Sequence, residues 1–209
     1  MNTRLIGPLM GIVFIILAIV AAIVGGTTPD ANDSVQKVVS FYTDHGSDQQ
    51  WAGAIFAVGG VAFLFFLGTL RQALRAAAGD EGFLSTMALL GGLMITVGIS
   101  IFAGIGFTLG DAADDIPAAA TQALNALNSD MFFTVAIGTI VFNLGLALAV
   151  LRHGGLPRPL GWVALVLGIA GFLGPIGFFA FVATGIVIIW ASVWLAMEAS
   201  APETSATTT

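Results

Sequence analysis

The side chains of this sequence that could take part in chemistry are few, and the most polar of them lie within long apolar stretches. Asn143 and Thr139 belong to one such stretch and Thr96 to another. Neutral amides and hydroxyls form hydrogen bonds to a neighbouring helix or to a polar solute, whereas catalysis of hydrolysis needs an acid, a base or a metal cluster. The sequence therefore predicts an interhelical contact at Asn143, Thr139 and Thr96 or, alternatively, the polar wall of a solute cavity.

Carboxylates form the second candidate group. Asp111, Asp114 and Asp115 are spaced i, i+3 and i+4, and a hard cation such as Ca²⁺ takes several oxygen ligands. The sequence does not have the spacing of an EF-hand, and a solvated acidic surface accounts for the pattern without a metal. We therefore expect an outer acidic patch at these three residues and no metal site.

Residue types for other kinds of catalysis or cofactor binding are missing. The chain has no cysteine and two histidines, so a thiol nucleophile, a thiolate ligand and a disulfide are excluded. His45 and His153 fall in segments expected on opposite sides of the protein, so they cannot share a site. We expect no enzyme activity, no catalytic residue, no cofactor and no nucleic-acid partner.

The composition indicates that membrane-spanning helices position these residues. Mean hydropathy is +1.00, and 9% of the residues are charged. About 20 apolar residues, rising 1.5 Å each, cross a hydrocarbon core of about 30 Å. Because lipid offers the backbone no hydrogen-bond partner, each long uncharged run predicts a helix. The uncharged runs are 5–29, 49–70, 82–110, 131–151 and 159–197.

The last run is too long for one crossing. Gly171, Gly174, Pro175 and Gly177 interrupt it, and glycine and proline at this density mark a break. The division predicts an all-α, polytopic bundle of six transmembrane helices, and a kinked re-entrant segment is the alternative for this last run. The expected transmembrane helices span about 5–25, 51–70, 84–109, 131–151, 160–174 and 176–197.

Two further helices are expected outside the lipid core. Apolar residues recur at helical spacing in the segments 33–43 and 117–127, which predicts short amphipathic helices that lie at the outer interface or cover the bundle. Residues 1–197 would then form a single transmembrane domain. The polar residues 198–209 predict a disordered cytoplasmic tail.

The first three-quarters of the chain contain a possible internal repeat. GSDQQWAGAI (46–55) aligns with NSDMFFTVAI (128–137), and each segment precedes a helix that ends in Leu-Arg. A duplication would relate residues 5–75 to residues 84–155 as parallel repeats about an axis along the membrane normal. Chance similarity between two apolar segments is the alternative.

Basic residues predict the orientation. With six crossings, five arginines fall on one side of the membrane and Lys37 alone on the other, and the positive-inside bias places the arginine side in the cytoplasm. The protein is thus expected in the cell membrane with both termini cytoplasmic. The five arginines are Arg4, Arg71, Arg75, Arg152 and Arg158.

Small residues predict where helices approach closely. The 27 glycines are nearly twice the usual share of about 7%, and small residues four apart let helix backbones meet where lipid removes the hydrophobic drive. We expect the helices at 84–109 and 160–174 to be the buried ones, with intrachain packing favoured over contact with a second copy. The small pairs are Ser100/Gly104, Gly106/Gly110, Ala164/Gly168 and Ala170/Gly174.

Three stretches carry a family resemblance. LRHGGLPRPLGWVALVLGIAGFLG, FLGTLRQALRAA and ALNALNSDMFF resemble segments of uncharacterised bacterial multi-pass membrane proteins, whose inner turn reads like R-x-G-x-L-P-R-x-L-G-W. The resemblance covers most of residues 1–197. It implies a six-helix membrane protein and supplies no catalytic residue.

Two classes of function are consistent with the sequence. The first is a non-enzymatic membrane protein that acts by binding a partner, a lipid or a second copy of itself. The second is a small permease or exporter for an apolar or neutral solute, which a cavity lined by Asn143, Thr139 and Thr96 would favour. Ionisable side chains are missing from every expected helix core, which argues against proton-coupled transport.

The predicted topology can be tested by labelling, because the chain has no native cysteine. Single cysteines introduced at Arg75 and Arg158 should react with a membrane-impermeant maleimide from the same side of the membrane, since both positions lie in turns on the arginine side. Reaction from opposite sides would rule out the six-crossing arrangement.

Overall fold

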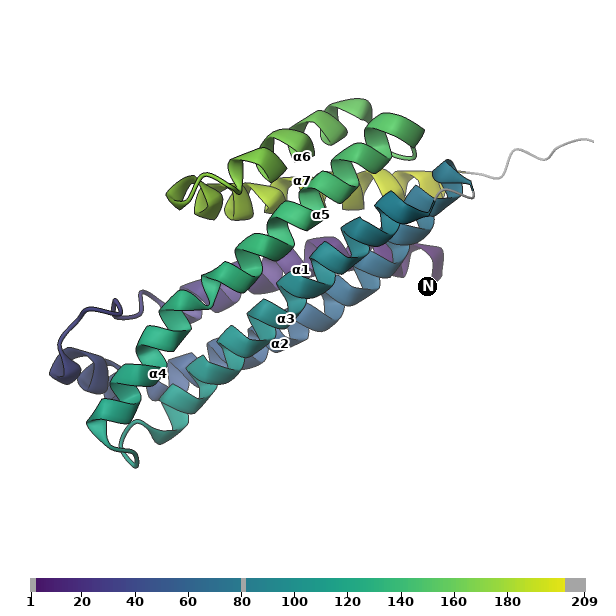
Figure 1. The fold of residues 1–209 in the computed structure, drawn as a ribbon. Coiled ribbons are helices and arrows are strands. Elements are labelled where there is room, and N and C mark those ends of the chain that lie inside the picture. Colours follow the sequence, from purple (N-terminus) through teal and green to yellow (C-terminus); the bar gives the residue numbers. More distant parts are fainter. Residues whose placement is uncertain (1–2, 80–81, 202–209) are drawn as a thin grey trace, which may run out of the picture.

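The computed structural model describes residues 3–79 and 82–201, and within these ranges the chain forms seven α-helices and no strand (Figure 1). The protein is therefore an all-α polytopic helix bundle, as the sequence predicts, and apolar helices occur at all six expected transmembrane positions. The helices are α1 (Thr3–Gly25), α2 (Val35–Ala78), α3 (Phe83–Ala112), α4 (Ala118–Asp130), α5 (Phe132–His153), α6 (Arg158–Ala170) and α7 (Pro175–Ser200).

The two expected amphipathic helices differ from the prediction in how they join the bundle. The segment 33–43 is helical, as expected, and it forms the first part of α2: a kink with non-helical backbone angles at His45 (φ −119°, ψ 19°) separates residues 35–44 from the rest of α2. The segment 117–127 forms α4, which ends at Asp130, so that only Met131 separates it from α5. The expected tail is also shorter, because Glu198–Ser200 continue α7, whereas 202–209 lie outside the described residues.

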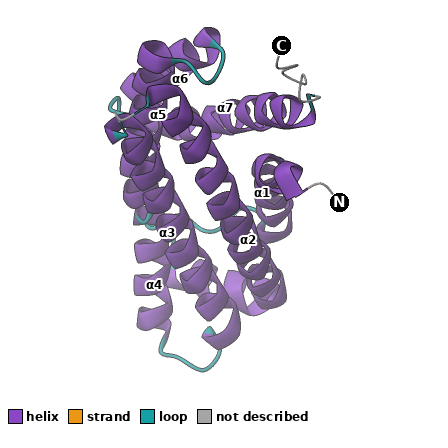
Figure 2. Cartoon of the chain, turned by 90° about the vertical axis from the view of Figure 1, so that its right-hand side faces the viewer, coloured by secondary structure: helices purple, strands orange, loops and turns teal. Residues whose placement is uncertain are grey.

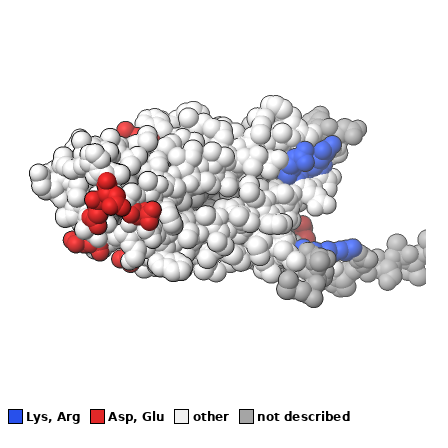
Figure 3. Space-filling view, turned by 90° about the horizontal axis from the view of Figure 1, so that it is seen from below, with Lys and Arg blue, Asp and Glu red and all other residues white. Residues whose placement is uncertain are grey.

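Charged residues lie at the two ends of the bundle and leave a wide apolar band between them (Figure 3). One end carries Arg71, Arg75, Arg152 and Arg158, and we call it the arginine end. Of the described acidic residues, only Glu198 in the last turn of α7 belongs to this end. We call the opposite end the acidic end; its carboxylates are Asp30, Asp33, Asp44, Asp48, Asp111, Asp114, Asp115 and Asp130.

A seam of small residues holds α2 against α3. Gly46, Gly53 and Gly60 recur every seven residues along α2, and they face Gly110, Ala103 and Thr96, which have the same spacing along the antiparallel α3. A Cβ atom at Gly53 would lie 2.8 Å from the carbonyl oxygen of Ala103, and one at Gly46 would overlap the carbonyl oxygen of Gly110. A seven-residue period keeps one helix face turned toward its partner. The two backbones touch at Gly46 and Gly53, and at Gly60 the methyl group of Thr96 lies against the α2 backbone.

A second seam of the same spacing joins α3 to α5. On α3, Gly91 and Gly98 face Phe142 and Val135; on α5, Gly138 and Gly145 face Ile95 and Ala88. A Cβ atom would lie 2.7 Å from the Ile95 amide nitrogen at Gly138 and 2.5 Å from the Ala88 nitrogen at Gly145. Because α3 has a seam on each of two faces, it is the central helix of the bundle.

The i, i+4 pairs identify this packing only in part. Gly110 and Gly168 do meet a neighbouring helix, but Gly104, Gly106 and Gly174 have no atom close to where a Cβ would be. The expectation that the helix at 160–174 is buried is wrong, since Trp162, Val166 and other large side chains of α6 are more than half exposed. The governing period is seven, because the helices cross at shallow angles over long distances.

The helix α6 is shorter than the other apolar helices. Five helices are long and apolar enough to cross a membrane, whereas α6 has 13 residues, which span about 20 Å. It starts from the turn after α5, where Gly154 (φ 84°) and Gly155 (φ 81°) adopt left-handed backbone angles, and it returns along α5 until Gly171 packs on Ile140. Ile140 is eight residues, or about 12 Å, from the start of α5, so the turn between α6 and α7 does not reach the acidic end. From this turn α7 runs at an angle to α2 and α3 (Figure 2).

The seams predict a sharp contrast between two Gly→Ala substitutions. Gly138→Ala should destabilise the protein by about 1–3 kcal/mol, because its methyl group has no room against the backbone of α3. Gly104→Ala is the matched control in a site with open space, and it should be neutral or slightly stabilising because alanine favours helix over glycine. Unfolding of the detergent-solubilised variants by titration with a denaturing detergent measures both effects. Equal stability of the two variants would contradict the close backbone contact.

Candidate functional site

Asn143, Thr139 and Thr96 lie in the core of the bundle, where they form hydrogen bonds within the protein. The Asn143 Nδ2 donates to the carbonyl oxygen of Thr139 (2.9 Å) and to Thr184 Oγ1 in α7 (2.8 Å). Thr139 and Thr96 donate to carbonyl oxygens of their own helices. All three are buried, and none of them lines the cavity described below. Asn143 Oδ1 accepts no hydrogen bond from a described residue.

The acidic patch lies where α3 ends, and it is exposed. Two of its carboxylates contact α2: Asp114 Oδ1 accepts a hydrogen bond from Thr43 Oγ1 (2.6 Å), and Asp111 Oδ1 accepts one from Gln50 Nε2 (3.2 Å). Among the described residues, no cluster of His, Asp or Glu has a geometry suited to a metal ion. The patch thus joins two helices, and Asp115 extends it at the surface.

A polar layer closes the acidic end. This end layer consists of the α1–α2 connection (26–34), the first turns of α2 up to the kink, and α4. Tyr42 Oη donates to Asn125 Oδ1 (2.8 Å), and Asn125 Nδ2 in turn donates to the carbonyl oxygens of Pro29 and Asp30 (both 3.3 Å). Both side chains are at most 1% exposed. These bonds fix α4 over the end of the bundle.

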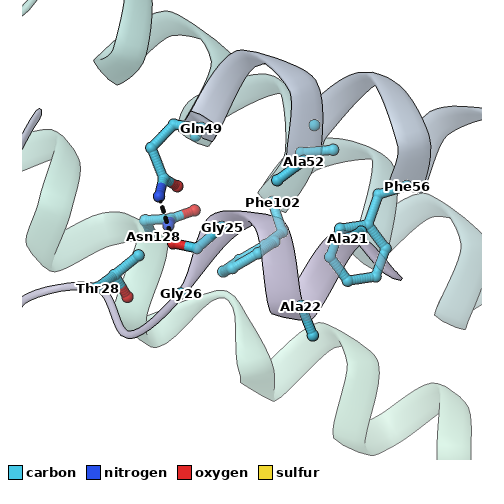
Figure 4. A pocket seen from close by; sticks show the side chains of 13 residues that line it. Ala21, Ala22, Gly25, Gly26, Thr28, Gln49, Ala52, Phe56, Phe102 and Asn128 are labelled. Atoms are coloured by element: carbon cyan, nitrogen blue, oxygen red, sulfur yellow. Dashed lines mark hydrogen bonds between the residues drawn. The ribbon is translucent and has the colours of Figure 1, made fainter. Parts of the chain in front are cut away.

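A cavity lies directly beneath the end layer, between α1, α2, α3 and α4 (Figure 4). Its volume is about 170 Å³. Gln49 from α2 and Asn128 from α4 meet beside Gly25 at its polar side, and Ala21, Phe56 and Phe102 line its apolar side. Gln49 is tied to the end of α1, because its Nε2 donates to the carbonyl oxygen of Gly25 (2.6 Å).

An adjoining apolar cavity of about 470 Å³ shares Phe56, Phe102 and Asn128 with the first. It extends toward α5 and α7, where Phe132 and Phe178 meet with ring centroids 5.6 Å apart. Phe178 keeps 51% of its surface exposed at the flank of the bundle. The two cavities therefore form one amphipathic site, polar at Asn128 and apolar toward the lipid-facing flank.

The site has two electrostatic features that decide what it can bind. Its lining residues include no ionisable side chain, so a buried charge would find no counter-ion. Asn128 is 4% exposed, and its Oδ1 accepts no hydrogen bond from any described residue. A buried amide oxygen without a donor costs about 1–3 kcal/mol relative to a satisfied one, so Asn128 favours a ligand that donates a hydrogen bond to it.

The sequence reasoning missed both polar residues of this site. Gln49 and Asn128 lie in the two segments, 46–55 and 128–137, that were aligned as a possible repeat. The alignment pairs Gln49 with Met131 and Asn128 with Gly46, so it did not indicate that these two side chains converge. They meet because α4 folds over the end of the bundle.

Tyr42 provides a direct test of the end layer, which lies outside the membrane-spanning segments. Burial raises the pKa of Tyr42 to about 12, against an ordinary value near 10. The folded state holds this proton more tightly than the unfolded chain, so stability is unaffected below pH 10 and falls as the pH rises toward 12. Tyr42 is the only tyrosine in the chain, so the absorbance of tyrosinate reports on it alone. A titration midpoint near pH 10 would show that the Tyr42 hydroxyl is not buried. The Tyr42→Phe variant, which has no tyrosine, gives the background absorbance.

The cavity is the feature from which a function has to be deduced. No protein-family model matches the chain, and no curated protein or solved structure matches it either. The chemistry of the lining residues consists of hydrogen bonding by two neutral amides and apolar contact by aromatic rings.

Proposed function

We propose that this chain is a multi-pass protein of a bacterial cell membrane, with both termini cytoplasmic, that acts without catalysis by binding a small amphipathic molecule beneath its end layer. The five arginines support this orientation through the positive-inside bias. Of a partner, a lipid and a second copy as ligands, the size and lining of the site favour the lipid, since cavities of about 170 and 470 Å³ with mostly apolar walls are too small to admit a folded partner.

The observation that carries the proposal is the position of Asn128. Ligand sites are mostly apolar, have a few polar groups that fix orientation, and measure about 300–1,000 Å³. The larger cavity has about 470 Å³ and apolar walls, and Asn128 offers a buried, unsatisfied acceptor at the junction of the two cavities. A molecule with one polar and one apolar end fits this arrangement.

Transport of a neutral solute is the second candidate, and the structure gives it less support. Below the cavity, toward the arginine end, the bundle is filled by Phe63, Phe66 and Phe142, which have no exposed surface. Phe14 stacks on Phe63 with centroids 4.4 Å apart. Asn143, which the transport alternative would place in the wall of a pathway, bonds to Thr184 of α7. A closed aromatic core favours binding over passage.

Filling the cavity should abolish binding. Gly106 lines the smaller cavity, and a Cβ there would meet no atom within 4 Å, so Gly106→Leu occupies the site without displacing the backbone. Gly104→Leu, two residues away, also has open space but lines neither cavity.

The two variants are compared with a photoreactive probe, a long-chain alkyl diazirine, which has no head group and on illumination reacts with the residues that it contacts. Wild type and Gly104→Leu should be photolabelled on the peptides that carry Phe56 and Phe102, and a total lipid extract of the membrane should compete. In Gly106→Leu this labelling should fall about tenfold or more. Labelling of all three proteins to the same extent would exclude the site.

A further inference from the structure

The lining of the cavity also selects the chemistry of its ligand, provided that the proposed binding function holds. An ion moved from water into a site without a counter-ion is strongly disfavoured, and none of the residues that line either cavity is ionisable. The part of the ligand that enters must therefore be uncharged. This condition excludes phosphate, carboxylate and ammonium head groups from the site.

The polar groups of the site determine which neutral head group fits. The Gln49 Nε2 already donates to Gly25, whereas Asn128 Oδ1 has no donor among the described residues. A head group that only accepts hydrogen bonds would leave this oxygen unsatisfied, and a head group with a hydroxyl or an N–H would satisfy it. The buried Asn143 Oδ1 is also unsatisfied, but Asn143 lines neither cavity.

The route into the cavity indicates where the apolar part comes from. The larger cavity lies at the flank of the bundle, where the contacting rings of Phe132 in α5 and Phe178 in α7 form part of its wall. A third apolar hollow, between α1 and α7, shares Phe181 with it. Both lie within the apolar band of the bundle, so a single hydrocarbon chain in the membrane reaches Phe56 and Phe102 from the side.

From these observations we propose that the cavity binds a single-chain lipid with an uncharged head group that donates a hydrogen bond to Asn128. The chain lies along Phe56, Phe102 and Phe181, and the head group lies beneath the end layer beside Gln49. A lipid alcohol, a monoacylglycerol and a primary acyl amide share this chemistry.

The test compares competitors of equal chain length against photolabelling of the wild-type protein by the alkyl diazirine. 1-Monooleoylglycerol has hydroxyl donors, methyl oleate has acceptors only, and oleylammonium is charged. Monooleoylglycerol should compete at a concentration about tenfold or more below that of either other lipid, which corresponds to about 1.4 kcal/mol. This comparison uses wild type alone, so it does not depend on whether a variant folds.

Substitution then assigns the preference to one atom. Asn128→Leu keeps the size of the side chain and removes the acceptor, so monooleoylglycerol and methyl oleate should compete equally. Ser100→Ala is the control, because the Ser100 hydroxyl donates to the Thr96 carbonyl oxygen of its own helix and Ser100 lines neither cavity, and it should keep the wild-type preference. The Tyr42 titration shows whether the end layer is intact in each variant.

The outcomes separate the two proposals. Equal competition by monooleoylglycerol and methyl oleate in wild type, or stronger competition by methyl oleate or oleylammonium, overturns the head-group assignment and leaves lipid binding in place. A preference that persists in Asn128→Leu overturns the role of Asn128. Labelling that no lipid reduces, and that is unchanged in Gly106→Leu, removes the proposed function and this inference with it.

Discussion

Direct contact between helix backbones at glycine is the constraint on which the rest of this structure depends. In lipid, burying an apolar side chain against another helix gains little, so helices associate where their surfaces fit closely. Gly53 against Ala103 and Gly138 against Ile95 show the result, since neither position has room for a methyl group. Because these glycines recur every seven residues, the contact is repeated along 46–60 of α2 and 138–145 of α5, and it fixes the register of both helices against α3.

At the acidic end, polar side chains join the segments in addition to the contact between Gly46 and Gly110. Tyr42, Asn125 and Gln49 bond to backbone carbonyl groups or to each other across segments far apart in sequence. The end layer therefore rests on the bundle through directional bonds, and apolar space remains below it. The short α6 adds to this space, because it covers α5 only up to Ile140. A cavity thus forms where one kind of packing gives way to another.

The polar residues inside the bundle have roles that their residue types alone do not reveal. Asn143 and Asn128 are both buried amides with an unsatisfied oxygen. The side-chain amide nitrogen of Asn143 donates hydrogen bonds to α5 and α7 and so links the two helices. Asn128, in contrast, lies where the two cavities adjoin. What distinguishes them is the space beside each side chain, which depends on how three or four helices meet.

The sequence by itself determined the all-α class, the positions of the apolar helices and the gathering of arginine at one end. The length of an apolar run and the positions of charged residues are local properties of the chain, and they decide which segments enter lipid and which stay in water. It also marked 171–177 as a break. Only the tertiary structure decided which glycines touch a backbone, that the segment 33–43 joins the rest of α2 through a kink at His45, and that α6 ends level with Ile140 of α5. It alone brought Gln49 and Asn128 together, since their meeting requires α4 to dock over the bundle, and such long-range docking leaves no periodic trace in the chain.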